Sequence, residues 1–473
     1  MDNDRGRDPT HRLRRFALTV LVGIASFAPA GGCGGSDEPP GTAADRTLTV
    51  WVLESEPDRI RAAKDDVARF ARATGLEVDV VGVSDDELAR RVSDARRAGR
   101  LPDVLQLPMA SAHAYARDDG ILDGDAAQDV VDQLGEETFS ARALSLLTSE
   151  GRVTAVPSDA WGQLLIYRKD LFAKAGLPTP RTLADVLRAA RRLHSRRVAG
   201  ITLATAPTAF TAETFEHVAV AAGCELIDDD GDIALTSPEC RYAFELYLQL
   251  ARNYSVEGVQ DVDSTRDTYF AGRAAMILWS PFLLDAMAGL RDDAVPSCPQ
   301  CRADRAFLAR NSGLVGPLAG TSGEPAQFGT VSTWGIVADG NVEGGKRFVG
   351  YMMSDGYVPW LALSPQGKYP VRFGDGADPE RYVEAWSSLE SGVERKAPLS
   401  RFYSRASIES LGDGARNFQR WGFEQGGAAL VGAMRGPEPV ARALASAIRD
   451  GASAARAAQR AQRAVEQLDA SLR

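Results

Sequence analysis

The stretch "TLTVWVL" at residues 47–53 opens the region that decides the fold. Its β-branched and apolar residues predict a buried strand, and residues 57–75 then carry apolar side chains at helical spacing up to a terminal glycine. The pattern repeats with a strand at 76–83, a helix at 85–99 and a strand at 102–108. Strands and helices that alternate in this order predict an α/β unit around a parallel sheet.

The loops of this unit carry none of the common cofactor motifs. After the first strand the sequence reads "LESEPD", so the G-x-G-x-x-G dinucleotide fingerprint is absent, and no G-x-x-x-x-G-K-[ST] occurs. The four histidines sit at no metal-ligand spacing. In "IDDDGD" at 227–232, Leu226 falls where a calcium loop needs its first ligand, so the Asp-Gly pair predicts a hairpin turn. We expect no cofactor and no metal.

The composition is that of a globular protein with an acidic balance. The chain has 473 residues, of which 44% are hydrophobic and 25% charged, and its formal net charge is −10. The length suggests about two or three domains. The net negative charge disfavours nucleic acid and anionic lipid as partners. No segment beyond the N-terminal region reaches about 18 consecutive apolar residues, so we expect no transmembrane helix.

The N-terminal residues read as an export signal. Arginines precede the apolar run "FALTVLVGIASFAPA" at 16–30, and "AGGC" follows, ending at Cys33. Small residues before a cysteine resemble the lipobox of bacterial lipoproteins, which implies that residues 1–32 are removed and that Cys33 carries a lipid anchor at the outer face of the cell membrane. A plain secretory signal is the alternative. Residues 33–45 are rich in Gly, Pro and Ser and predict a flexible tether.

Four further cysteines form an even set, which in an exported protein predicts disulfides. Local pairing would join Cys224 to Cys240 and Cys298 to Cys301. The C-P-Q-C stretch also fits a redox centre or half of a zinc site. Its surroundings, "DDAVPSCPQCRADR", are a polar loop, whereas a redox motif should open a helix after a buried strand. This setting favours a structural bridge.

Several motifs along the chain occur in the order of a known family. They resemble stretches of the extracellular solute-binding proteins of ABC importers, in the sugar-binding cluster. The pieces are "PDVLQL" at 102–107, "GILDG" at 120–124, "LLIYRKDLFAKAGLPTPRTLADVL" at 164–187, "TYFAGRAAMILWSPF" at 268–282 and the alanine-rich 439–472. The resemblance covers residues 47–470. Arg168 stands where the family usually has Asn, and Ser280–Phe282 stand where it usually has Gly-Pro-Trp.

The resemblance implies a fold and a function. The fold would be α/β, with two lobes like those of periplasmic binding proteins, a ligand cleft between them and several hinge crossings. The implied lobes are 46–157 plus 331–370, and 158–330 plus 371–473. The implied crossings lie near 155–159, 328–332 and 368–374. The implied function is that of a monomer, not an enzyme, that binds a mono- to oligosaccharide and delivers it to the permease subunits of an ABC transporter.

Other functions stay open at this point. A cationic or amphipathic solute, such as a polyamine or a peptide, would use Glu54 and Asp159 as counter-ions and the tryptophans as a cation–π box. A lipoprotein that presents its ligand to a sensor would have the same sequence features. A glycoside-active enzyme would need two carboxylates at a set separation, for which Glu54 and Asp159 are a candidate pair.

The candidate ligand-binding residues follow strands or predicted crossings, because open α/β sheets bind ligands beyond the carboxyl ends of their strands. Polar side chains would hold sugar hydroxyls, and aromatic rings would cover the C–H faces. Alternate residues of one strand point the same way, as in 159, 161 and 163, and the resemblance places Phe282 at a ligand-stacking position. The full set is Glu54, Ser55, Glu56, Met109, Ser111, Asp159, Trp161, Gln163, Trp279, Phe282, Ser332, Thr333, Trp334, Tyr369 and Arg372. Core packing is the alternative for the tryptophans.

Overall fold

The computed structural model describes residues 47–117, 120–320, 324–392 and 395–472. Contacts divide the chain into residues 1–41 and 42–473, and all described residues belong to the second unit. The predicted signal, tether and lipid anchor at Cys33 therefore lie outside the described residues. Among the helices that are described, none is long and apolar enough to cross a membrane.

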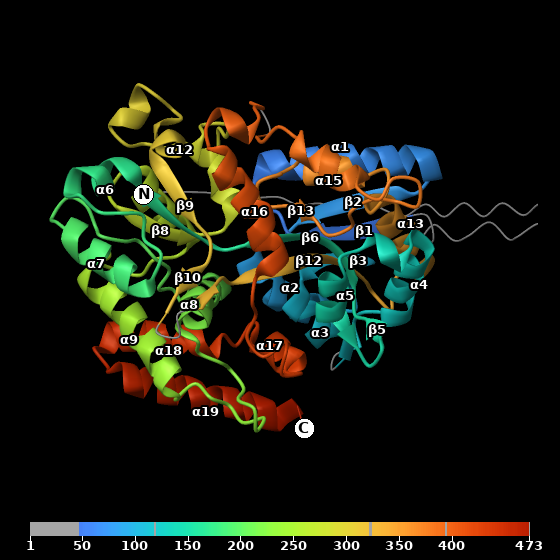
Figure 1. Ribbon diagram of the computed structural model, residues 1–473. Coiled ribbons are helices and arrows are strands. Elements are labelled where there is room, and N and C mark those ends of the chain that lie inside the picture. The colour runs from blue at the N-terminus through green and yellow to red at the C-terminus, as the bar shows by residue number, and fades with distance from the viewer. Residues whose placement is uncertain (1–46, 118–119, 321–323, 393–394, 473) are drawn as a thin grey trace, which may run out of the picture. The chain divides into compact units, whose positions relative to one another are not determined.

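A six-stranded sheet organises the N-terminal part of the fold (Figure 1). In spatial order its strands are β13 (Tyr369–Pro370), β6 (Val156–Gly162), β12 (Gly329–Ile336), β3 (Val104–Pro108), β1 (Thr47–Val52) and β2 (Glu77–Gly82). β1 runs parallel to both β2 and β3, which confirms the predicted α/β unit, whereas β12 is antiparallel to β3 and to β6. β12 and β13, which come late in the sequence, thus belong to the same sheet as β1, β2 and β3.

Helices cover both faces of this sheet, because successive strand residues point to opposite sides. Val50 and Val52 pack into one cluster, and Trp51 packs into the other. The first cluster includes α1 (Pro57–Thr74), α4 (Gly124–Leu134), α13 (Val342–Met352) and α14 (Tyr357–Leu361). The second includes α2 (Asp85–Arg97), α3 (Met109–Arg117) and α5 (Ala141–Leu147). We call the sheet and these helices the first lobe.

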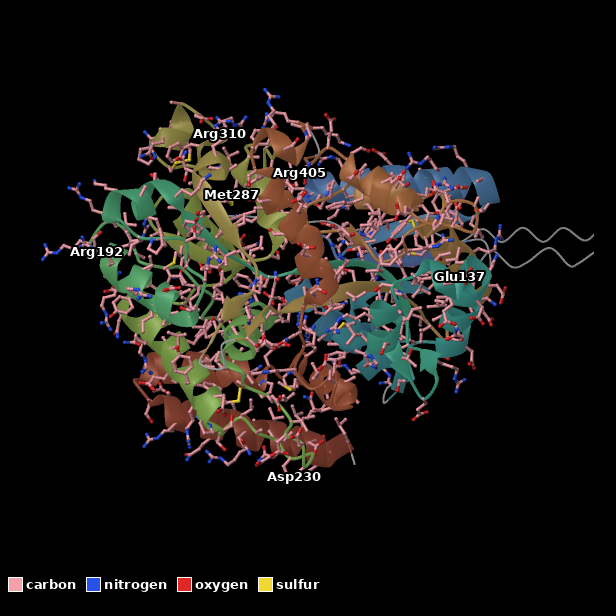
Figure 2. The ribbon with its side chains drawn as sticks, viewed as in Figure 1. Glu137, Arg192, Asp230, Met287, Arg310 and Arg405 are labelled. Carbon is pink, nitrogen blue, oxygen red and sulfur yellow. A yellow bond between two sulfur atoms is a disulfide. The ribbon has the colours of Figure 1, made fainter. Side chains whose placement is uncertain are left out.

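A smaller antiparallel sheet organises the second lobe. Its order is β8 (Met276–Trp279), β7 (Leu164–Arg168) and β9 (Ser312–Val315). The hydrophobic cluster on one face includes residues of α6 (Lys169–Ala175), α7 (Leu183–Leu193), α8 (Ala209–Ala222), α9 (Pro238–Asn253), α17 (Ala428–Met434), α18 (Pro439–Asp450) and α19 (Ala454–Leu472). The other packs on α10 (Val262–Phe270), α11 (Leu284–Met287) and α12 (Phe307–Asn311). Figure 2 shows Met287 inside this lobe and Arg192 pointing outward.

The remaining elements are short or lie outside the two sheets. They are β4 (Thr148–Ser149), β5 (Arg152–Val153), β10 (Leu318–Ala319), β11 (Pro325–Ala326), α15 (Arg381–Ser387), α16 (Arg405–Asn417) and the 3₁₀ turns Glu136–Thr138, Pro281–Leu283, Gln300–Arg302 and Leu399–Arg401. α16 contributes Leu411 to a cluster of the second lobe and Ala415 to a cluster of the first. It therefore packs against both lobes.

Several local predictions are confirmed. Thr182 caps α7 in a reciprocal capping box with Asp185, and Gly272 leaves α10 with a φ of 71° before β8 begins. The turn before Asp232 pairs Ile227 with Ile233 as a hairpin, not as a calcium loop. Both disulfides are present with the predicted local pairing, Cys224–Cys240 and Cys298–Cys301.

The chain passes from the first lobe to the second between β6 and β7, and the segment 368–374 lies in the first lobe. Only Gln163 separates β6 of the first lobe from β7 of the second. Tyr369 still pairs with β6, and Tyr382 packs in the first lobe's core, whereas Leu399 packs in the second lobe. Strand pairing thus holds the segment 368–374 in the first lobe. The exact residue boundaries of the lobes stay a prediction.

Candidate functional site

A cluster of buried charges joins the two lobes where β1 ends. Its first-lobe members follow β1 or begin α1, its second-lobe members follow β8, and Lys368 precedes β13. We call this set the buried charge cluster: Glu54, Asp58, Arg59, Asp285, Arg291 and Lys368. All six are at most 6% exposed. Buried charges on this scale require partners, because an unpaired ion loses its hydration without compensation.

Two ion pairs of the cluster cross from one lobe to the other, and a third, between Lys368 and Glu54, lies within the first lobe. Arg59 Nη2 lies 2.9 Å from Asp285 Oδ2, and Arg291 Nη2 lies 2.8 Å from Asp58 Oδ1. Lys368 Nζ lies 3.5 Å from Glu54 Oε1. Three cations thus face three carboxylates, so the cluster itself is close to neutral.

Two further carboxylates at its edge change the electrostatics. Arg291 Nη2 also lies 2.6 Å from Asp293 and 3.5 Å from Glu56. Burial raises the pKa of Asp58 to about 6, and Asp293 adds to this while Arg291 opposes it. The Nε atoms of Arg59 and Arg291 have no hydrogen-bond partner among the described residues. These two N–H groups can each donate a hydrogen bond to a further acceptor.

An aromatic pair lies beside this cluster. The rings of Trp161 and Phe282 meet edge-on with centroids 6.3 Å apart, and Trp161 also meets Phe328 at 5.7 Å. Phe282 lies between two cations, with Arg59 Cζ 5.7 Å and Lys368 Nζ 5.8 Å from its ring centre. Trp161 and Phe282 are each only partly buried. The lobes therefore share a surface on which apolar rings adjoin hydrogen-bonding charges.

A cavity of about 220 Å³ opens elsewhere between the lobes. Asp85 and Ser111 line it from the first lobe, and Thr208, Arg435 and Glu438 line it from the second. Arg435 pairs with Asp85 across the lobes and lies 3.0 Å from Glu213. Burial raises the pKa of Glu213 to about 8, with Asp85 adding to the effect and Arg435 opposing it.

The structure brings four of the predicted ligand residues to the shared surface. Glu54 belongs to the charge cluster, and Glu56 lies 3.5 Å from Arg291. Trp161 and Phe282 form the aromatic pair. Ser55, between the two acids, is exposed, and Ser111 lines the interlobe cavity.

Other predicted residues lie inside the lobes. Asp159 is fully buried and accepts hydrogen bonds from Trp360 Nε1 and Ser158 Oγ. Thr333 donates to the Leu107 carbonyl, and Arg372 donates to carbonyls of Leu134 and Met353. The remaining predicted residues also pack into the first or the second lobe: Met109, Gln163, Trp279, Trp334 and Tyr369 are at most 8% exposed, and Ser332 is partly buried within β12.

Sequence reasoning missed all three cations of the buried charge cluster. Arg59 reads as one arginine of an amphipathic helix, and Lys368 is the first residue of a predicted crossing without any motif of its own. Asp285 offered a signal, because it is a single acid inside the apolar run "PFLLDAMAGL". A carboxylate in such a run must be buried and must therefore find a cation.

Comparisons with known proteins place the chain in a family. The family model described as bacterial extracellular solute-binding protein matches residues 54–359, which is more than half of the chain. The chain belongs to this family. A relative in Escherichia coli (strain K12), YcjN, carries the name of an ABC transporter periplasmic-binding protein. It is 28% identical over 368 residues, covering 75% of this chain and 78% of YcjN.

Solved structures share the fold. T. maritima MalE3, bound to maltose, superposes with a TM-score of 0.68 at 18% identity over 89% of this chain and 99% of that chain. The GacH receptor of Streptomyces glaucescens, studied with acarbose, gives 0.69 at 18% identity over 89% and 98%. UgpB of Mycobacterium tuberculosis, in complex with glycerophosphocholine, gives 0.67 at 18% identity over 90% and 99%. The described fold is that of the two-lobed binding proteins.

Proposed function

We propose that the protein binds a carbohydrate between its lobes and delivers it to an ABC permease without changing it. The observation that carries this proposal is the aromatic pair Trp161–Phe282 beside buried charges from both lobes. A sugar presents C–H faces that suit aromatic rings, and rim hydroxyls that suit carboxylates and guanidinium groups.

The family and its relatives support this choice. MalE3 was solved with maltose and GacH with acarbose, and both share this fold. We infer that a mono- to oligosaccharide enters when the lobes part and that the closed form, joined by pairs such as Arg59–Asp285, is recognised by the permease. In this proposal the protein acts as a monomer.

Binding without catalysis fits the positions of the acids. Glycoside hydrolysis needs two carboxylates that flank the scissile bond. Asp159, one of the two candidates, is fully buried and held by Trp360 and Ser158 inside the first lobe. Glu54, the other, is held near Lys368 and Arg59. These contacts support a binding site.

A thermal-shift screen of neutral mono- and oligosaccharides tests the proposal on residues 46–473. Ligand at about a thousand times its dissociation constant stabilises the native state by about 4 kcal/mol, which a melt detects readily. We expect at least one saccharide to raise the melting temperature and to be recovered unchanged. Recovery of a cleaved sugar would show an enzyme instead, and a screen in which only peptides or polyamines bind would refute the carbohydrate.

A matched pair of tryptophan variants locates the site. Trp161 lies in the aromatic pair, whereas Trp386 on α15 is also partly buried but packs against Tyr369 of the first lobe. We expect Trp161→Ala to lose the saccharide-induced shift and Trp386→Ala to keep it. The ligand-free melt of each variant corrects for any loss of packing. Equal responses in both variants would place the sugar elsewhere.

The proposal includes export and anchoring at the outer face of the membrane through Cys33. Mass spectrometry of the membrane-bound mature protein should find a lipidated N-terminal cysteine at position 33. A mature protein that starts elsewhere and carries no lipid would leave secretion without an anchor. Co-purification with permease subunits, rather than with a sensor, would support the role in import.

A further inference from the structure

The interlobe cavity between α2, α3 and the second lobe carries an excess of carboxylates. Asp85 and Asp86, at the start of α2, line it from the first lobe, and Glu438, just before α18, lines it from the second. Glu213 on α8 lies behind Arg435, and with its pKa raised to about 8 it is protonated at neutral pH, so it adds no charge there. We call this space the acidic cavity; its volume is about 220 Å³.

The two arginines of the cavity do not balance these acids. Arg435 is already shared between Asp85 and Glu213, each within ion-pair distance. Arg442 and Asp86 are both exposed at the rim, and Arg442 donates to the Pro437 carbonyl. Glu438 is 7% exposed, and among the described residues its carboxylate accepts one hydrogen bond, from the Gly436 N–H of its own loop, 3.2 Å away. Arg435 is near enough to lower its pKa, but no cation of a described residue forms an ion pair with it.

A buried hydroxyl independently marks this space as a site. Ser111 on α3 is 2% exposed and lines the cavity, and its side chain makes no hydrogen bond to any described residue. A buried polar group without a partner is costly, so such a group usually serves a ligand or a bound water. The Ser111 hydroxyl can accept from an ammonium or pair with a sugar hydroxyl.

We propose that the acidic cavity binds a protonated amine of the solute, so that the ligand is an amino-bearing carbohydrate. An ammonium there would face Asp86 and Glu438, donate to Ser111 and complete the local charge balance. Burial raises the pKa of Glu438, although Arg435 opposes it, as expected where an acid awaits a cation. This inference rests on the proposed carbohydrate function and narrows its ligand class.

Calorimetry on residues 46–473, with three disaccharides that share the same linked pair of sugar rings, tests the proposed amine site. The probes are the β-1,4-linked glucosamine disaccharide, its N-acetylated form and cellobiose, with spermidine as a cation without a sugar. We expect the glucosamine disaccharide to bind at least tenfold more tightly than the two neutral forms. In Glu438→Gln and Asp86→Asn, that preference should fall to less than threefold, because each variant removes one charge.

The variants keep the remaining geometry, and a control isolates charge. Glutamine at 438 retains the oxygen that accepts from Gly436, and Glu409→Gln on exposed α16 removes an acid outside the cavity. Glu409→Gln should keep the full preference.

Equal affinity for all three disaccharides would overturn the amine site while leaving the carbohydrate function intact. Binding of spermidine alone, lost in Glu438→Gln, would retain the amine site and refute the carbohydrate. No binding of any probe would overturn the amine site.

Discussion

Arg59 of the first lobe and Asp285 of the second form a buried ion pair, with 2.9 Å between Nη2 and Oδ2. Their side chains are 7% and 0% exposed. Asp285 also lies 3.8 Å from Arg291, and Arg59 lies 3.9 Å from Glu54. Because water is excluded, each member of this pair depends on the other for its charge to be tolerated.

We therefore expect Asp285→Asn to lower the free energy of unfolding by about 3 kcal/mol, since it leaves the buried Arg59 guanidinium without its nearest carboxylate. The double variant Arg59→Met with Asp285→Asn should recover part of that loss, because one stranded charge is removed as well. Urea unfolding measures both. The exposed pair Arg405–Glu409 supplies the control, where Glu409→Gln should cost less than about 1 kcal/mol. If Asp285→Asn lowered the free energy of unfolding no more than Glu409→Gln does, the mutual dependence of Arg59 and Asp285 would be contradicted.

The sequence was informative where the signals are local. The strands and helices of 47–108, the Thr182 cap and the Gly272 exit depend on residues within a few positions of one another, and all are found. The disulfides followed from a short separation along the chain. Phe282 was placed through the family resemblance and Trp161 through its alternation with Asp159 after a predicted crossing, and the contact of their rings agrees with a shared surface.

The charge cluster could not be predicted because its partners are distant in sequence. Arg59 and Asp285 are separated by 226 positions, and the sequence around each residue gives no indication that the other is its partner. Trp334 shows the opposite difficulty. It follows a predicted crossing, yet its ring packs against Phe348 and Trp360, with centroids 5.8 Å and 4.9 Å away. Only the folded packing distinguishes such a core tryptophan from a surface one.

The two disulfides should contribute differently to stability. Cys224–Cys240 closes a separation of 16 residues, and Cys298–Cys301 one of 3. Loop-closure entropy then gives about 3 kcal/mol for the first and about 2 kcal/mol for the second. Urea unfolding of the paired alanine variants measures the order. Equal costs would contradict the entropic account.

The same thiols are expected to be inert in redox assays. Cys298 and Cys301 are 0% and 2% exposed, whereas reactive cysteines are partly exposed. The purified protein should not catalyse the reduction of insulin by dithiothreitol above the uncatalysed rate. Turnover that disappears in the Cys298→Ala variant would restore the redox reading of this motif.

His217 predicts how stability depends on pH. It is fully buried on α8, its Nδ1 accepts from the Phe328 N–H, and burial lowers its pKa from 6.5 to about 3. The unfolded chain therefore binds a proton between pH 6.5 and 3 that the native protein does not. Stability from this group is full above pH 6.5 and falls as the pH drops, by about 1.4 kcal/mol per unit.

From pH 7 to pH 5 this group should thus cost about 2 kcal/mol. His217→Asn keeps an acceptor for the Phe328 N–H but cannot titrate. From pH 7 to pH 5 its free energy of unfolding should therefore fall by about 2 kcal/mol less than that of the parent protein. Urea unfolding at both pH values gives the comparison, with exposed His194→Asn as control. If the free energies of unfolding of His217→Asn and the parent protein changed in parallel from pH 7 to pH 5, His217 would take up its proton in the native state as it does in the unfolded chain.

Small residues let α3 of the first lobe and α17 of the second approach closely. A Cβ atom at Gly432 would lie 2.5 Å from the Ala110 carbonyl oxygen and 2.9 Å from the Ala114 Cβ. Contacts below 3.0 Å cannot be kept, so a side chain there must move one helix away from the other. Since the two helices belong to different lobes, that movement is a separation of the lobes.

We expect Gly432→Leu to hold the lobes apart. Small-angle X-ray scattering should show a larger radius of gyration than for the parent protein, and saccharide affinity should fall at least tenfold because the two halves of the site no longer meet. Gly350→Leu is the matched control, since a Cβ at that helical glycine meets nothing within 4 Å. It should leave both measurements unchanged. A Gly432→Leu variant with unchanged radius and affinity would show that α17 yields locally, and the α3–α17 contact would then have no part in closure.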